Sequence, residues 1–209
     1  MSDPAMRYAQ LLLDWNQTVN LTGARTREEV DRHIQNAYRL LELPWDGILR
    51  AVDIGSGGGL PAIPLALRMP GVEFSLLEAN TRKCAFLQQV AITLEMTNIR
   101  VLPGRAEELA RRPELREQFD RAISRAVAQP PVLLELALPF VRTGGDLLAE
   151  VSELDPEALQ GVARLLGGGT PRLRRGPTGK DAILEVDKVG PTPSRYPRRT
   201  GVPNRKPLA

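Results

Sequence analysis

Hydrophobic and polar positions follow a helical period in the first quarter of the chain and an alternating strand–helix pattern after it. Apolar side chains recur at helical spacing over residues 4–16, which predicts an amphipathic helix. A second helix is expected to begin at Thr26, because Thr26 and Glu29 form a capping-box pair, and to end before Pro44. We expect the two helices to form an N-terminal cap over residues 1–45.

Beyond the cap, apolar runs of strand length alternate with segments of helical period. Strands are expected near residues 50–54, 72–77, 99–102, 120–124, 146–151 and 182–188. Helices are expected near residues 61–69, 82–95, 105–111, 130–140 and 155–166. This alternation predicts an α/β fold, a Rossmann-like doubly wound sheet whose strands are mostly parallel. Gly144 and Gly145 are expected to turn the chain into a strand, and residues 167–180, rich in glycine and proline, to form a loop or disordered connection.

The 209 residues suffice for one core, with little left for a second. We therefore predict a single domain made of the cap, a core over residues 46–190 and a tail over residues 191–209. No run approaches the roughly 20 apolar residues that span a bilayer, and no signal-peptide pattern opens the chain, so a cytoplasmic protein is expected. The single cysteine, Cys84, suits a reducing compartment and a place in the core, and with one histidine, His33, it argues against a metal site.

The charge is distributed unevenly along the chain. From Arg172 to the end there are ten Lys or Arg against three acids, whereas the preceding residues hold eighteen bases and twenty-two acids. A basic tail on a slightly acidic body suggests a polyanionic partner, for which nucleic acid is the usual candidate, although a solubilising tail remains the alternative.

A glycine-rich segment follows the first predicted strand of the core. The apolar run that contains Asp53 leads into Gly55-Ser56-Gly57-Gly58-Gly59-Leu60, and the next strand ends on Glu78, 23 positions after Gly55. This order of strand, glycine turn, helix, strand and acid holds nucleoside cofactors at the carboxyl edge of parallel sheets. Leu60 occupies the position of the last glycine in the dinucleotide fingerprint, which favours S-adenosylmethionine over NAD. Asp53 could orient the turn or contact the methionine amine.

The final segment, residues 195–208, combines arginines, prolines and one tyrosine. Its prolines predict an extended, non-helical chain beside Tyr196, in which the cations remain available to phosphates. The expected RNA-binding residues are Arg195, Arg198, Arg199, Arg205 and Lys206.

Several of these segments together resemble the RsmG family, also called glucose-inhibited division protein B. The resemblance covers nearly the whole chain, from Trp15 to Leu208. It rests on Trp15-Asn16 with Asn20-Leu21-Thr22, Arg32-His33, Asp53 to Pro61, Ser124-Arg125-Ala126 and the Tyr-Pro-Arg-Arg tail. The resemblance implies a class I methyltransferase fold and transfer of a methyl group from S-adenosylmethionine to N7 of a guanine in 16S ribosomal RNA of the small subunit.

The resemblance also implies roles for particular residues. The cofactor contacts it carries over are Gly55, Leu60, Glu78, Ala79, Asn80, Ala106, Glu107 and Arg125. Candidate catalytic or substrate-placing residues are Arg125, Asn20 and His33. From the residues alone, Arg125 could donate to guanine O6, contact a phosphate, close over the cofactor or remain a solvated charge. His33 lies on the apolar stripe of its helix and could simply be a packed side chain.

The chain departs from the family pattern in three places. Asn36 and Ala37 replace an Asp-Ser pair, and Ala62 replaces a glycine. Glu150, in the strand expected near residues 146–151, replaces a Lys that the family often has at the end of that strand. The alternatives are therefore an RNA-binding or ribosome-assembly protein with little turnover on the same fold, or a methyltransferase for another RNA or small molecule. We expect the protein to act as a monomer.

Overall fold

The computed structural model describes residues 3–125, 127–152, 154–175 and 182–209. Within these residues a seven-stranded sheet has the order β3-β2-β1-β4-β5-β7-β6. The strands are β1 (Arg50–Ile54), β2 (Glu73–Glu78), β3 (Ile99–Pro103), β4 (Phe119–Arg125), β5 (Val141–Val151), β6 (Arg172–Arg175) and β7 (Ala182–Asp187). The first five are parallel, whereas β7 runs antiparallel to β5, and β6 antiparallel to β7.

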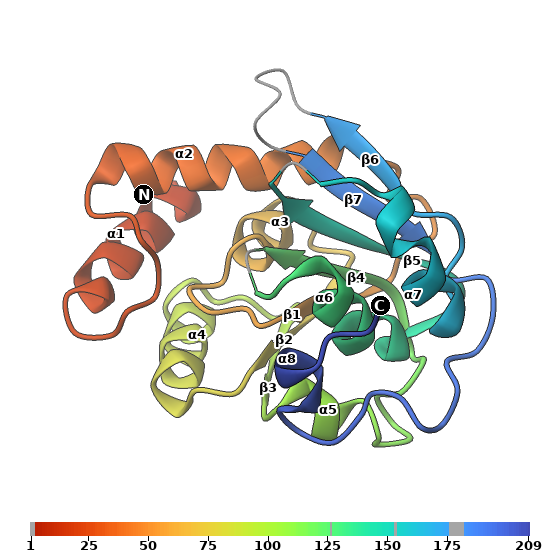
Figure 1. The fold of residues 1–209 in the computed structure, drawn as a ribbon. Coiled ribbons are helices and arrows are strands. Elements are labelled where there is room, and N and C mark those ends of the chain that lie inside the picture. The colour runs from red at the N-terminus through yellow and green to blue at the C-terminus, as the bar shows by residue number, and fades with distance from the viewer. Residues whose placement is uncertain (1–2, 126, 153, 176–181) are drawn as a thin grey trace.

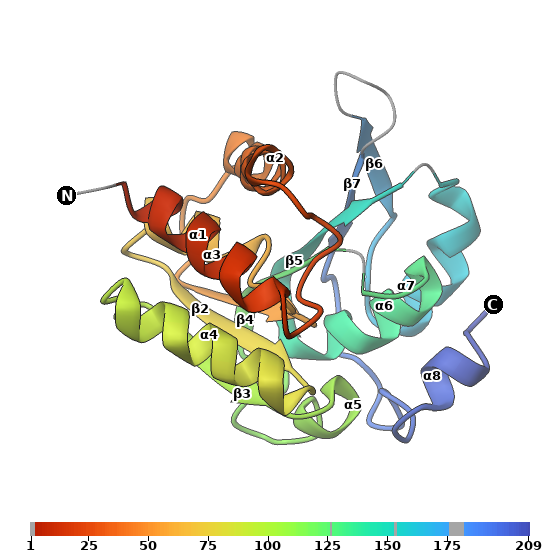
Figure 2. The ribbon, with the colours of Figure 1, turned by 90° about the vertical axis from the view of Figure 1, so that its left-hand side faces the viewer.

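Helices cover both faces of the sheet (Figures 1 and 2). They are α1 (Pro4–Asn16), α2 (Arg27–Tyr38), α3 (Ala62–Arg68), α4 (Thr81–Thr93), α5 (Ala106–Leu109), α6 (Pro130–Ala137), α7 (Gln160–Leu165) and α8 (Val202–Arg205). Short 3₁₀ turns occupy Arg39–Glu42, Leu138–Phe140 and Glu157–Leu159. None of the helices in the described part of the chain has the length and apolar character that crossing a bilayer requires.

Successive strand residues point to opposite faces, which divides the core in two. Ala51 packs with α1 to α4 on one face, whereas Val52 packs with α5 to α7 on the other. Apolar residues on both faces of the central strands are typical of a parallel sheet buried between two helical layers. The predicted α/β, doubly wound fold is confirmed.

The cap helices begin as their sequence predicts. The Thr26 hydroxyl accepts from the Glu29 backbone N–H, and the Glu29 carboxylate accepts from the Thr26 N–H, so the expected capping box forms at α2. Tyr8 of α1 is fully buried and its hydroxyl donates to the Gly58 carbonyl at 2.6 Å. The cap therefore packs directly against the glycine-rich turn.

Three predictions about the second half of the chain are wrong. Residues 172–175 of the expected loop form β6, although residues 176–180 of that loop lie outside the described residues. Gly144 and Gly145 lie within β5, which already begins at Val141. The tail contains the short helix α8, because Pro203 occupies the first turn, where a missing N–H costs no hydrogen bond.

Candidate active site

The glycine-rich turn joins β1 to α3 at the carboxyl edge of the sheet. Gly55, Gly57 and Gly59 have φ angles of 70°, 53° and 83°, in the left-handed region that favours glycine. A Cβ at Gly55 would lie 2.8 Å from a methyl group of Val127, and one at Gly58 would lie 2.9 Å from Leu12. The absence of a side chain at these glycines therefore lets Val127 and Leu12 pack closely against the turn.

Glu78 ends β2 and holds this turn in place. Its Oε2 accepts from the Gly57 backbone N–H at 2.9 Å, and its Oε1 accepts from the Asn80 N–H at 2.8 Å. The side chain is buried, yet each carboxylate oxygen has a second lone pair that a ribose hydroxyl could use. The expected acid at the strand tip is therefore preorganised against the glycine turn.

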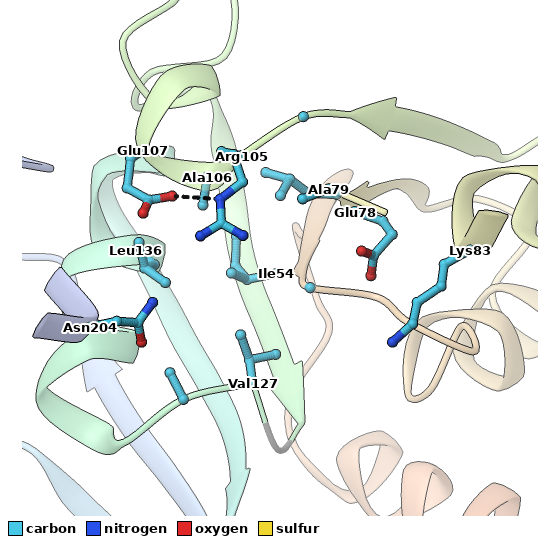
Figure 3. Close-up of a pocket in the computed structure, with 14 residues that line it drawn as sticks. Ile54, Glu78, Ala79, Lys83, Arg105, Ala106, Glu107, Val127, Leu136 and Asn204 are labelled. Atoms are coloured by element: carbon cyan, nitrogen blue, oxygen red, sulfur yellow. Dashed lines mark ion pairs between the residues drawn. The ribbon is translucent and has the colours of Figure 1, made fainter. Parts of the chain in front are cut away.

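A hollow opens beside Glu78 at the same edge of the sheet (Figure 3). It is lined by residues of β1 and β2, of the loops after β1, β2, β3 and β4, of helices α4, α5 and α6, and by one residue of α8. The lining residues are Ile54, Gly55, Leu77, Glu78, Ala79, Lys83, Gly104, Arg105, Ala106, Glu107, Val127, Ala128, Leu136 and Asn204. Five predicted cofactor contacts, Gly55, Glu78, Ala79, Ala106 and Glu107, are brought together here.

A second hollow adjoins the first on the side of the cap helices. Its lining residues are Leu21, Thr22, Gly23, His33, Gly55, Ser56, Gly57, Gly58, Leu60, Lys83 and Arg125. Gly55 and Lys83 line both hollows, so the two form adjoining parts of one site. The predicted residues Leu60, Arg125 and His33 meet in this second part.

Arg125 is the charged centre of the second hollow. Its Nη2 lies 2.6 Å from His33 Nδ1. Because a guanidinium can only donate, Nδ1 must accept and the His33 proton must sit on Nε2. Partial burial, followed by the charges of Arg125 and Arg32, lowers the pKa of His33 and so favours the neutral ring.

Glu150 supplies the acidic partner of Arg125. The two residues are opposite each other in the parallel pairing of β4 with β5, and Glu150 Oε2 lies 3.5 Å from Arg125 Nε. Both side chains are more than four-fifths buried, since 19% and 18% of their surfaces are exposed. The residue that departs from the family pattern therefore forms a partly desolvated ion pair at the site.

Asp53 lies on β1 on the same face of the sheet as this pair. It is fully buried, and neither carboxylate oxygen has a hydrogen-bond partner among the described residues. Burial raises the pKa of Asp53 well above its ordinary value. A cationic group bound nearby would favour its charged form, so this carboxyl suits a site for a positively charged cofactor.

Two predicted residues line neither hollow. Asn20 is exposed in the loop after α1, and Asn80 is the N-cap of α4, where its Oδ1 accepts from the N–H groups of Arg82 and Lys83. The loop is organised instead by the buried Asn16, whose amide donates to the carbonyls of Thr22 and Ala24 and whose Oδ1 accepts two N–H groups. Asn16 thus shapes the loop that brings Thr22 to the site.

The other family departures lie outside both hollows. Ala37 and Ala62 are fully buried in the core on the cap side of the sheet, and Asn36 is half-buried on α2. They change packing near the cap and add no polar group to the hollows. Cys84 is buried in α4, as expected for a core residue.

The tail folds back over the far end of the first hollow, contrary to the prediction of an extended segment. Arg198 makes a bidentate ion pair with the fully buried carboxylate of Glu135. Its Nε donates to Oε1 at 2.9 Å and its Nη2 donates to Oε2 at 2.6 Å. Tyr196 is buried, and its carbonyl accepts from Arg116 at 2.9 Å. Arg195, Arg199, Arg205 and Lys206 are exposed, whereas the Arg198 guanidinium is committed to Glu135.

Sequence reasoning missed several residues that shape the site. Lys83 and Asn204 carry polar groups at the hollows, and Val127 packs under Gly55. Lys83 lies in the first turn of α4, the helix that follows Glu78. The position of this helix directly after the acidic strand tip could have indicated Lys83. Asn204 carried no such signal, because its place depends on how the tail folds.

These residues fit S-adenosylmethionine. The first hollow combines an apolar lining with an acidic strand tip, and the buried carboxyl of Asp53 stands two residues before Gly55, which lines both hollows. Together, the parallel sheet, the glycine turn and the acid at the end of β2 define a class I methyltransferase.

The chain belongs to the GidB family, described as rRNA small subunit methyltransferase G, whose sequence pattern matches residues 2–159. It is 41% identical to "Ribosomal RNA small subunit methyltransferase G" of Moorella thermoacetica, over 96% of this chain and 88% of the relative. The predicted family and its S-adenosylmethionine cofactor are confirmed.

Solved structures share the fold at low identity. The mitomycin 7-O-methyltransferase MmcR superposes with a TM-score of 0.60 and 20% identity, over 78% of this chain and 56% of that one. The T. thermophilus 16S rRNA N2 G1207 methyltransferase, in complex with AdoMet and guanosine, gives a TM-score of 0.54 and 18% identity, over 76% of this chain and 40% of that one. Both likenesses concern the methyltransferase fold alone.

Proposed function

We propose that the protein transfers a methyl group from S-adenosylmethionine to N7 of one guanine in 16S ribosomal RNA. The observation that carries this proposal is the meeting of the two hollows at Gly55 and Lys83. One part suits a nucleoside cofactor, and the other presents the guanidinium of Arg125 to an incoming base. Family membership favours an enzyme over the alternative of an assembly protein without turnover.

The reaction requires little of the protein beyond aligning guanine N7 with the methyl carbon of the cofactor. When bound, S-adenosylmethionine supplies a methyl group activated by a positively charged sulfur. Guanine N7 carries a lone pair and no proton, so its attack on the methyl carbon needs no general base. The bonding pair of the broken carbon–sulfur bond stays on sulfur, and the positive charge passes to the guanine ring. Positioning is therefore the main catalytic contribution expected.

We assign distinct tasks to the residues of the site. Gly55 to Leu60 and Glu78 hold the cofactor, and Glu78 accepts from the ribose hydroxyls. Arg125, held by His33 and Glu150, donates to guanine O6 or to a phosphate and so orients N7. The partly buried Glu150 carboxylate places negative charge near the positive charge that the reaction moves, and a bound cationic cofactor would favour the charged form of the buried Asp53.

We further propose that the substrate contacts the exposed cations of the tail and that the protein acts as a monomer in the cytoplasm. Arg195, Arg199, Arg205 and Lys206 are exposed and available to phosphates. The tail then serves both as part of the folded site and as an RNA contact.

The test combines purified protein, labelled S-adenosylmethionine and either naked 16S ribosomal RNA or small subunits, followed by mapping of the labelled nucleotide. We expect 7-methylguanosine at one position, and its loss with Arg125→Ala. Label on another base or atom, or on a small molecule in a cell extract, would support the alternative methyltransferases. RNA binding without transfer to either substrate would support the assembly protein.

A further inference from the structure

The tail is fixed to the body of the protein by several interactions that are distant in sequence. The Arg198 side chain and backbone N–H bind the Glu135 carboxylate, which is fully buried in α6. Three residues later, the Gly201 N–H donates to Glu107 Oε1 at 2.9 Å. The Thr200 hydroxyl donates to Glu108 at 3.0 Å. These contacts hold α8 against α5 and α6, beside the first hollow.

Asn204 is the residue through which the tail reaches that hollow. Figure 3 shows its carboxamide extending from α8 toward Leu136 and the interior of the hollow, on the side away from Glu78 and Lys83. No hydrogen bond joins this carboxamide to any residue that the structure describes. It therefore presents both a donor and an acceptor to whatever fills this end of the site.

The surroundings of Asn204 suit a flat heteroaromatic ring. Leu77, Ala106, Ala128 and Leu136 line the hollow with apolar surface, and Figure 3 shows Glu107 on the same side of the hollow as Asn204. If Glu78 holds the ribose, the base of the cofactor lies beyond it, at the Asn204 end. Adenine carries an amino donor next to ring-nitrogen acceptors, and a carboxamide matches that pattern with its own acceptor and donor.

We propose that Asn204, delivered by the folded tail, recognises the adenine edge of the cofactor and completes the binding site. This inference rests on the proposed function only in taking S-adenosylmethionine as the ligand. It makes the tail part of the cofactor site as well as an RNA contact. Asn204 then acts as a specificity residue that the glycine-rich core alone lacks.

Calorimetry with S-adenosylhomocysteine, without RNA, tests the proposal. Asn204→Leu keeps the size of the side chain and removes both hydrogen-bonding groups, and we expect it to weaken binding about 3- to 10-fold. Gln88→Leu is the matched control, because Gln88 is an exposed carboxamide on α4 outside both hollows. The control should bind like the wild type, and both variants should keep the wild-type melting temperature.

A second ligand separates recognition from simple coverage of the hollow. The analogue with purine in place of adenine lacks the amino group, so it should bind the wild type more weakly but bind Asn204→Leu about as well as S-adenosylhomocysteine does. Equal affinity of wild type and Asn204→Leu for S-adenosylhomocysteine would overturn the proposal, as would an equal loss on amino-group removal in both proteins. A failure to methylate 16S ribosomal RNA would instead contradict the proposed function alone.

Discussion

Arg125 Nη2 and His33 Nδ1 lie 2.6 Å apart, and they join the end of β4 to the middle of α2 across 92 positions of sequence. The contact needs an unprotonated Nδ1, because two cationic groups would repel each other at this distance. His33 is thus a positioning residue for Arg125. Its protonation state decides whether that guanidinium stays in place.

We predict an acid limb in the pH profile of methyl transfer. Burial and the Arg125 and Arg32 charges lower the pKa of His33 below its ordinary value, whereas Glu29 opposes them. A group with a lowered folded pKa contributes stability above its unfolded pKa of about 6.5, and that stability is lost as the pH falls through the folded value. Turnover should fall in the same window.

The matched variant is His33→Gln, which has an amide oxygen to accept from Arg125 and does not titrate. It should retain activity at neutral pH and lose the acid limb. Rates measured across pH 5 to 8 in both proteins check this expectation. An unchanged limb in the variant would assign the titration to another group.

Glu150 should hold the Arg125 guanidinium in place together with His33. Glu150→Gln keeps the shape of the side chain and removes its charge, so Arg125 would be held mainly by His33. We expect kcat to fall about 10-fold or more, since small displacements of a positioning group are costly, while cofactor affinity changes little. Kinetics and calorimetry on the same preparation separate the two effects. A fall in cofactor affinity with unchanged kcat would show that Glu150 serves cofactor binding instead.

Glu78 should contribute directly to cofactor binding. Glu78→Ala removes a buried charged acceptor from the first hollow, and we expect a loss of about 1.5–3 kcal/mol in S-adenosylmethionine binding. Calorimetry measures this loss, and the melting temperature reports whether the glycine turn survives without its contact to Gly57. Unchanged affinity in a folded variant would remove Glu78 from the site.

Much of the site could be predicted from the sequence because it is built from local motifs. The glycine turn and Glu78 are set by chain order within one β-α-β unit, and parallel pairing brings their ends to one edge of the sheet. The role of Arg125 was implied by the family resemblance, and the residue ends β4 at the same edge of the sheet. The alternation of strands and helices also predicted the doubly wound, mostly parallel sheet.

The missed features depend on contacts that no local pattern encodes. The Arg198–Glu135 ion pair spans 63 positions, and it converts a proline-rich basic tail into a docked segment with a helix. Strand β6 consists of Arg172-Leu173-Arg174-Arg175, in which Arg172 pairs with Asp187 and Arg174 pairs with Glu185 on β7. Short edge strands with so few apolar residues give almost no hydrophobic signal.

The tail ion pair should matter for stability. Arg198→Ala would leave the fully buried Glu135 carboxylate without its main partner, and removing one member of a buried pair costs about 3–5 kcal/mol. Thermal and urea unfolding should show this loss. Arg199→Ala is the matched control, since that neighbouring side chain is exposed and should leave stability unchanged. Equal stability of both variants would mean that the tail is only loosely docked.

The tail cations should govern RNA affinity through counterion release. Deleting the tail would confuse this test, because Asn204 of the tail lines the first hollow. Neutralising Arg195, Arg199, Arg205 and Lys206 to Gln, with Arg198 left in place, preserves the docked tail. Each lost phosphate contact should reduce the salt dependence of RNA binding by roughly 0.7 to 0.9 log units per log unit of salt. We expect two to four contacts to be lost, with binding of S-adenosylhomocysteine unchanged. An unaltered salt slope would move the RNA surface from the tail to the body of the protein.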